Sequence, residues 1–233
     1  MTIKAVLFDF SGTLLRIESA ESWLRGTLAA TALSVPEAET ARLAAELELT
    51  GAQPGGRPGD PARLPAGLAA LWAVRDESAA AHRAAYTGLA RQVPLPHEDL
   101  YDALYERHMT PAAWQPYPDA HDVLATLRAR GLATGVVSNI GWDLRPVFRA
   151  HGLDALVDTY ALSYEHGVQK PDARLFAAAC QALGVAPAHT LMVGDDRQAD
   201  SGAAALGCAV HYVEHLPVAA RPAGLRPVLG LLD

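Results

Sequence analysis

Short apolar runs recur along the second half of the chain, spaced so that a helix fits between most of them. One run lies near the N-terminus at residues 3–8, and later runs occupy 134–137, 159–162, 190–193 and 208–213. Continuously apolar runs of this length are typical of strands that are buried on both faces. The pattern predicts an α/β fold with a doubly wound, parallel five-stranded, Rossmann-like core.

Residues 16–112 interrupt this alternation with a purely helical periodicity. Because an unstructured insertion of such length is implausible in a compact protein, we expect an α-helical cap domain at 16–112. The α/β core domain is then formed by 1–15 and 113–233. Cap helices are expected at 36–49, 64–92 and 97–108, with a mobile Gly- and Pro-rich loop at 51–61; core helices are expected at 119–130, 144–151 and 173–183, and 216–233 is expected to pack along the core.

Composition narrows the class of protein. Half of the residues are hydrophobic and 19% are charged, as in globular proteins. The net charge of −7 argues against a nucleic-acid partner. No apolar stretch approaches the roughly 20 residues that cross a bilayer, and the first strand begins too early for a signal peptide. We expect a cytoplasmic monomer or homodimer without a membrane segment, in which Cys180 and Cys208 are buried free thiols.

Polar residues follow four of the five predicted strands. Asp9 ends the first, Ser138 and Asn139 follow the second, Lys170 follows the third, and Asp195 follows the fourth. Each has a plainer explanation as a turn, a surface lysine or a helix cap. Since the carboxyl ends of parallel strands share one edge of a sheet, their repetition there favours a common site.

The chemistry of these residues suits phosphoryl transfer. Asp9, Asp195 and either Asp196 or Asp200 form a cluster of like charges that needs a cation, and oxygen-only ligands favour Mg²⁺ over zinc. Lys170, one of only two lysines among 19 basic residues, supplies a compact positive charge. Such a site fits in-line transfer through an aspartyl-phosphate. The expected substrate contacts are Phe10, Thr13, the Ser138 hydroxyl and the Asn139 backbone N–H.

The motifs run Asp9-x-x-Gly12-Thr13, Ser138-Asn139, Lys170-Pro171-Asp172 and Gly194-Asp195-Asp196-x-x-x-Asp200. Their order resembles the haloacid dehalogenase (HAD) superfamily of hydrolases, in the subgroup with an α-helical cap after the first motif. The resemblance covers the core, while the cap matches only in position and helicity. It implies that Asp9 is the nucleophile and a Mg²⁺ ligand, that the Ser11 carbonyl is a second ligand, and that Asp195 is the main acidic ligand. It also implies that Asp196 and Asp200 hold metal-bound waters or pair with Lys170.

Ser11 departs from the family pattern. Phosphatases of this superfamily usually have an Asp at this position as general acid and base, and general acid–base catalysis contributes ~10²–10⁴-fold. We therefore expect slow turnover of ordinary phosphomonoesters and a smaller loss for substrates with good leaving groups. P-type ATPases resemble this arrangement with Thr at the same position and still form a phospho-aspartate.

The favoured function is a Mg²⁺-dependent phosphatase or phosphoryl transferase acting on a small phosphorylated metabolite, with Asp9, Ser11 and Lys170 as catalytic residues. One alternative is a catalytically degenerate HAD protein that binds a phosphorylated ligand or partner. A weaker alternative is a 2-haloacid dehalogenase, which needs no Mg²⁺ and would leave the acidic cluster unneutralised. Cap candidates for substrate contact are Trp23, Arg25, Trp72, Arg75, His82 and Tyr86, whereas His97, His108, His121 and His151 are expected at the surface or at helix ends.

Overall fold

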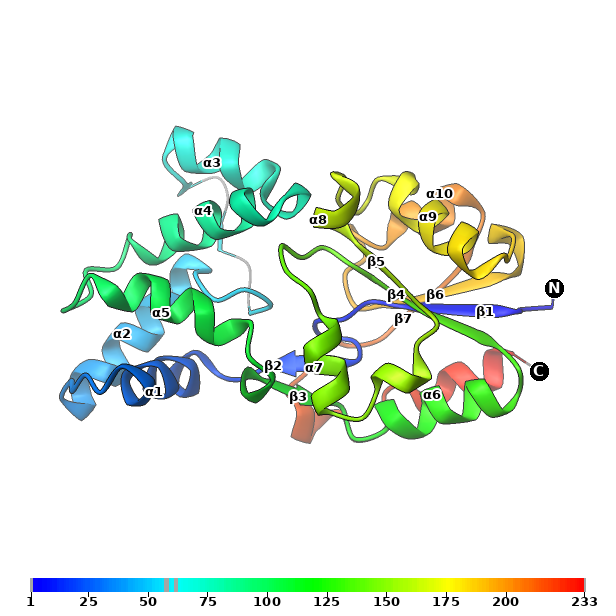
Figure 1. The fold of residues 1–233 in the computed structure, drawn as a ribbon, viewed down its shortest axis with the longest axis horizontal. Helices are drawn as coiled ribbons and strands as arrows, with labels where there is room; N and C mark the ends of the chain where they lie inside the picture. The colour runs from blue at the N-terminus through cyan, green and yellow to red at the C-terminus, as the bar shows by residue number, and fades with distance from the viewer. Residues whose placement is uncertain (1, 57–58, 61–62, 233) are drawn as a thin grey trace.

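The computed structural model describes residues 2–56, 59–60 and 63–232. A five-stranded parallel sheet with the order β5-β4-β1-β6-β7 forms its centre. In Figure 1, β1 runs from the N-terminus toward a group of helices, so the carboxyl edge of the sheet faces them. The predicted α/β fold with a parallel core is confirmed. The strands are β1 (Ala5–Phe8), β4 (Ala133–Ser138), β5 (Thr159–Leu162), β6 (Thr190–Gly194) and β7 (Ala209–Tyr212).

Helices cover both faces of the sheet (Figure 1). Alternating side chains of β1 point to opposite faces, so Val6 and Phe8 join one buried cluster and Leu7 joins another. The first cluster includes residues of α6 (Ala120–Ala129), α7 (Arg145–Ala150) and the 3-10 segment Arg226–Leu231, and the second includes residues of α9 (Ala173–Leu183) and α10 (Ser201–Leu206). The C-terminal segment therefore packs on the core, as expected.

A helical insert, residues 18–113, lies between two short strands, β2 (Leu15–Ile17) and β3 (Trp114–Pro116), which pair antiparallel. The insert has a buried apolar cluster of its own, separate from the two clusters on the sheet. Strands of three residues are too short to show a period in the sequence, so this pair was not predicted. The helices of the insert are α1 (Ala20–Thr31), α2 (Glu37–Thr50), α3 (Ala66–Ala73), α4 (Ala79–Ala90) and α5 (Asp99–His108).

The helix expected at 64–92 is two helices separated by a 3-10 turn, Arg75–Glu77. Ser78 has extended backbone, and its hydroxyl accepts a hydrogen bond from the Ala81 N–H (3.1 Å), so it begins α4 as an N-cap. Ser19 begins α1 in the same way through the Ser22 N–H. The loop expected at 51–61 lies partly outside the described residues.

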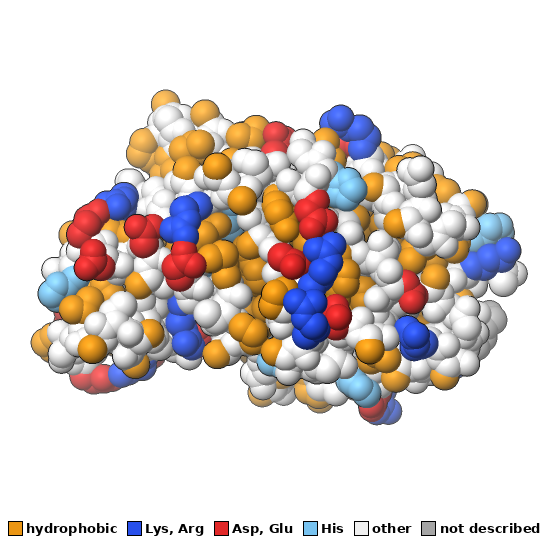
Figure 2. All heavy atoms as spheres, in the orientation of Figure 1, with side chains coloured by type: hydrophobic (Ala, Val, Ile, Leu, Met, Phe, Trp, Pro, Cys, Tyr) orange, Lys and Arg blue, Asp and Glu red, His pale blue; other side chains and the backbone are white. Residues whose placement is uncertain are grey.

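The charged surface and the two cysteines are arranged as the composition of the chain predicts. Figure 2 shows basic and acidic side chains interleaved on the visible face. Among the ion pairs of the exposed side chains, Arg83 pairs with Asp102 and Glu106. Cys180 and Cys208 are buried and free, as predicted. Within the part of the chain that the structure describes, no helix is both long enough and apolar enough to cross a membrane.

Candidate active site

Asp9 follows β1 at the carboxyl edge of the sheet. Its Oδ1 accepts a hydrogen bond from the Phe10 N–H (2.7 Å) and lies 3.0 Å from Lys170 Nζ. Burial raises the pKa of Asp9 to about 8, although the Lys170 charge opposes this shift. The Phe10 N–H therefore donates to the Asp9 carboxylate, and the Phe10 ring packs against the Trp114 ring with 4.2 Å between their centroids.

Lys170 lies between two carboxylates and is almost completely buried. Its Nζ donates to Asp200 Oδ1 at 2.8 Å, in addition to the contact with Asp9. Burial lowers the pKa of Lys170, but the two carboxylates outweigh it and keep the pKa above its usual value. Asn139 holds the lysine backbone, because its Oδ1 accepts from the Lys170 N–H (2.6 Å) and its Nδ2 donates to the Lys170 carbonyl (3.1 Å). The side chain of Asn139 thus positions the lysine.

Both oxygens of Asp195 have protein partners. The Thr13 hydroxyl donates to Oδ1 at 2.8 Å, and His215 Nδ1 lies 2.5 Å from Oδ2. Arg16 contacts the other ring nitrogen of His215. Gly12 permits this approach: its φ is +80°, and a Cβ at this position would lie 2.4 Å from Asp195 Oδ2 and from His215 Nδ1.

Asp196 and Asp200, which the resemblance treats together, have different surroundings. Asp200 is fully buried and pairs with Lys170. Asp196 is exposed, and its Oδ1 accepts from the N–H groups of Gln198 (2.8 Å) and Ala199 (3.0 Å). Asp196 thus stabilises the turn that leads into α10, and Asp200 helps to neutralise the lysine.

Ser11 and Ser138 complete the predicted set. The Ser11 hydroxyl donates to the carbonyl of Gly55 in the helical insert at 3.1 Å. Ser138 is the buried last residue of β4. The structure therefore brings the ends of β1, β4 and β6 and the segment that precedes α9 to one edge of the sheet, where the insert contacts the first loop.

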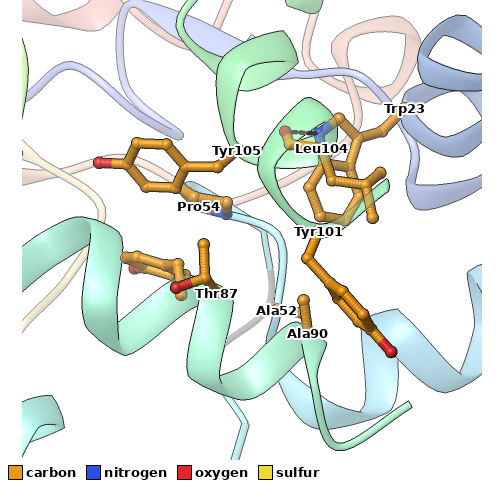
Figure 3. A pocket seen from close by; sticks show the side chains of 9 residues that line it. Trp23, Ala52, Pro54, Thr87, Ala90, Tyr101, Leu104 and Tyr105 are labelled. Atoms are coloured by element: carbon orange, nitrogen blue, oxygen red, sulfur yellow. Dashed lines mark hydrogen bonds between the residues drawn. The ribbon is translucent and has the colours of Figure 1, made fainter. Parts of the chain in front are cut away.

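Two of the insert residues proposed for substrate contact have partners within the insert itself. Arg25 pairs with Glu21 and Glu37 on the surface. Trp23 is buried, and its Nε1 donates to the Leu104 carbonyl at 3.0 Å. Figure 3 shows the side chains around a narrow space beside it that has no room for a water molecule; its lining is Trp23, Ala52, Pro54, Tyr86, Thr87, Ala90, Tyr101, Leu104 and Tyr105.

Of the other insert candidates, Trp72 and Tyr86 pack in the insert's own apolar cluster. The Arg75 guanidinium stacks over Trp72 at 4.0 Å; burial lowers the pKa of Arg75, but Asp76, Tyr86 and, to a smaller extent, Asp196 raise it above the usual value. His82 is buried, and its Nδ1 lies 2.7 Å from the Tyr105 hydroxyl.

His108 lies at a helix end, one of the two positions expected for it, but its side chain is not at the surface. It ends α5, but its side chain is fully buried at 5.5 Å from the ring of Trp142 in the core. Burial lowers the pKa of His108 to about 3, so the ring is neutral. The rings of His82, Tyr105 and Trp142 surround His108 and explain this burial, and a helical pattern alone does not reveal such partners.

Arg221 is a site residue that the sequence reasoning missed. It is 4% exposed, its Nη1 donates to the Gly12 carbonyl at 2.6 Å, and its Nη2 donates to the Thr13 carbonyl. The guanidinium also lies over the Tyr117 ring, 3.2 Å from its centroid. No sequence signal marks this arginine, whereas His215 follows the fifth predicted strand and was open to the same strand-end argument as the other four clusters.

Replacing Arg221 with Leu is expected to lower the free energy of unfolding by about 1.5–3 kcal/mol, the contribution of hydrogen bonds from a charged group. The reason is that the Gly12 and Thr13 carbonyls lose their donors. Urea denaturation measures the change. The matched control is Arg226→Leu, since Arg226 is 65% exposed and its substitution should change stability by less than about 0.5 kcal/mol. Equal effects of the two substitutions would contradict the structural role of Arg221.

Comparisons with known proteins agree with this geometry. A sequence model of the haloacid dehalogenase-like hydrolases matches residues 3–207. The phosphoserine phosphatase of Thermus thermophilus is 40% identical over 113 residues, which is 48% of this chain and 42% of that protein. The (S)-2-haloacid dehalogenase 1 of a Pseudomonas species is 35% identical over 92 residues, 39% of this chain and 40% of that protein. The matched stretches thus span less than half of these relatives.

A solved structure extends the likeness in fold. The L-2-haloacid dehalogenase from Xanthobacter autotrophicus, with chloropropionic acid covalently bound, superposes with a TM-score of 0.66 at 23% identity, covering 100% of this chain and 85% of that one. At this identity the likeness concerns the fold alone. The family match covers most of the chain, and the chain therefore belongs to the haloacid dehalogenase-like hydrolases.

Proposed function

We propose that this hydrolase is a Mg²⁺-dependent phosphatase that acts on a small phosphorylated metabolite through an aspartyl-phosphate on Asp9. The observation that carries the proposal is the arrangement of Asp9, Lys170 and Asp200, with contacts of 3.0 and 2.8 Å at the carboxyl edge of the sheet. We further propose that residues 16–112 form a cap over this edge and that 1–15 and 113–233 form the core domain. The phosphatase among the relatives supports the same reaction class.

The protein groups have distinct tasks in this reaction. A carboxylate oxygen of Asp9 attacks phosphorus while the bond to the leaving-group oxygen breaks. Lys170 balances the negative charge of the phosphoryl group and keeps Asp9 close to it. Asn139 and Asp200 keep the lysine in place. A water molecule then attacks the phosphorus of the aspartyl-phosphate and releases inorganic phosphate and free Asp9.

The donor set fits Mg²⁺. The proposed ligands, the Asp9 and Asp195 carboxylates and the Ser11 carbonyl, are all oxygens. Among the described residues, no group of three or more His, Cys, Asp or Glu side chains could hold a metal ion, so the proposed ion would need carbonyl, water and substrate oxygens as its other ligands. Mg²⁺, when bound, neutralises charge on the phosphoryl oxygens and orients them. A cation beside Asp9 would also lower its raised pKa and keep the carboxylate ionised.

The test is Mg²⁺-dependent release of phosphate from para-nitrophenyl phosphate, with EDTA as the control. Release that requires Mg²⁺ supports the proposal. Tight binding of a phosphate mimic without turnover of any activated phosphoester would favour the alternative of a degenerate protein that binds a phosphorylated ligand.

A 2-haloacid dehalogenase is the second candidate, and one observation favours it. His215 and Thr13 engage both oxygens of Asp195, and Arg16 contacts His215, so protein groups satisfy the hydrogen bonds of part of the acidic cluster. An acidic cluster held in this way depends less on a metal ion, as a reaction without Mg²⁺ requires. Chloride release from 2-chloropropionate in the presence of EDTA, without phosphatase activity, would establish it.

Replacing Ser11 with Asp is expected to raise turnover of alkyl phosphates about tenfold or more, and that of aryl phosphates less, because it restores a proton donor for poor leaving groups. A protonated carboxyl group can still donate to the Gly55 carbonyl as Ser11 does. Steady-state kcat/KM with one alkyl and one aryl phosphate measures the effect, and Ser11→Ala is the control. Equal or lower rates for both substrates would show that Ser11 is not simply a missing acid.

A further inference from the structure

The proposed reaction needs a proton at the leaving-group oxygen, and the first loop does not supply an acid. Ser11 replaces the expected carboxyl group, and its hydroxyl is engaged by Gly55. The helical insert contacts this edge of the sheet and carries acidic residues of its own. In the described part of the insert, Asp76 is the only Asp or Glu whose side chain is buried; its relative exposure is 2%.

Asp76 lies on the turn between α3 and α4, and this turn is attached to the segment that carries Lys170. The Asp76 N–H donates to Gln169 Oε1 at 3.2 Å, and Gln169 Nε2 donates to the Ala73 carbonyl at 2.8 Å. One side-chain amide therefore binds both the last residue of α3 and the middle residue of the turn that follows. Gln169 directly precedes Lys170, whose ammonium is 3.0 Å from Asp9, so the turn is held next to the catalytic groups.

The surroundings of the Asp76 carboxyl group favour its protonated form. Burial raises its pKa, and the positive charges of Arg75 and Lys170 reverse this only in part. Arg75 Nε lies 3.3 Å from one carboxyl oxygen, and His82 Nε2 lies 3.8 Å from the other. Tyr86 and Tyr105 are the other titratable groups near Asp76, and the charge of its carboxylate raises the pKa of each. Burial keeps His82 neutral by lowering its pKa well below the usual value.

We propose that Asp76 is the general acid and base of this enzyme, supplied by the helical insert in place of residue 11. The proposal rests on the phosphatase function proposed above. In the first step, Asp9 bonds to phosphorus, the P–O bond breaks with its electron pair passing to the leaving-group oxygen, and Asp76 gives that oxygen its proton to form the alcohol. In the second step, Asp76 accepts a proton from the attacking water as phosphate leaves Asp9.

This assignment explains two features together. A carboxyl group is buried in the insert against a basic and aromatic neighbourhood, an environment that general acids use to stay protonated. The Gln169 contacts attach the turn that carries Asp76 to the core segment that carries Lys170.

The test is the leaving-group dependence of Asp76→Asn. For an alkyl phosphate, kcat/KM is expected to fall about 10²–10⁴-fold, the usual contribution of general acid catalysis. For para-nitrophenyl phosphate, whose leaving group needs little protonation, we expect a loss of less than about tenfold. Glu77→Gln is the matched control; it changes the neighbouring carboxyl group and should leave both rates as in the wild type.

The outcomes separate the two proposals. Equal losses for the two substrates would overturn the role of Asp76 as an acid and leave the phosphatase function standing. No turnover by the wild-type protein with any phosphate ester would overturn the phosphatase function itself. Adding Ser11→Asp to Asp76→Asn should restore alkyl phosphate turnover at least tenfold, and no recovery would count against the proposal. If Asp76→Asn does not fold, Asp76→Glu is measured instead: a loss confined to alkyl phosphates supports the role, and an equal loss overturns it.

Discussion

Asp9→Asn is expected to lower phosphatase turnover by at least roughly 10⁴-fold, because an amide cannot attack phosphorus and no covalent intermediate forms. The change is isosteric, so the Phe10 N–H keeps an oxygen as its acceptor and the fold is retained. Initial rates with para-nitrophenyl phosphate measure the loss. The wild type should also yield a hydroxylamine-sensitive phosphoprotein that the variant lacks.

The control for Asp9→Asn is Asp122→Asn, which changes a carboxyl group that is 69% exposed on α6. It should leave turnover unchanged. Residual activity above about one per cent in Asp9→Asn, with mass spectrometry excluding deamidation back to Asp, would remove Asp9 from the role of nucleophile.

Lys170→Met is expected to lower the free energy of unfolding by about 3–5 kcal/mol, because removing one partner of a buried ion pair leaves the other charges uncompensated. The side chains of Lys170, Asp9 and Asp200 are 1%, 11% and 0% exposed, so solvent cannot replace the lost cation. Urea denaturation at pH 7 measures the change. Lys4→Met is the matched control, since Lys4 is exposed and its loss should cost little.

The free energy of unfolding of Lys170→Met is expected to depend on pH, in a direction set by the pKa of Asp9. The pKa of Asp9 is already raised by burial, and loss of the lysine raises it further. The folded state then binds the proton more tightly than the unfolded chain, so stability falls as pH rises above about 4. Adding Asp200→Asn should recover part of the loss by removing one uncompensated charge. A deficit below about 1 kcal/mol at all pH values would contradict the burial of this cluster.

Much of the fold follows from apolar runs. The strand at 159–162 and the helix at 173–183 have the predicted bounds. The spacing of apolar residues along a buried strand or an amphipathic helix is visible in the sequence itself. The turn at Arg75–Glu77 was missed, because Ala-rich segments on both sides continue the helical pattern and the break depends on Ser78 as a cap.

Some residues of the candidate site can be predicted from the sequence, and others cannot. Asp9, Lys170 and Asp195 each follow a strand, and strand ends can be located from the sequence. Arg221 and Asp76 act through contacts with segments that lie far away along the chain, and nothing local marks them. The partners that Thr13 and Asn139 choose, Asp195 and the Lys170 backbone, likewise depend on tertiary packing.

The position of Arg221 also has a consequence for the order of folding. Its hydrogen bond to Thr13 joins residues 208 positions apart. During translation the loop beside Asp9 is synthesised early, long before Arg221, which donates hydrogen bonds to the Gly12 and Thr13 carbonyls of that loop. We therefore expect the loop to acquire these hydrogen bonds late in folding. Proteolytic removal of the C-terminal segment that includes Arg221 would take them away again.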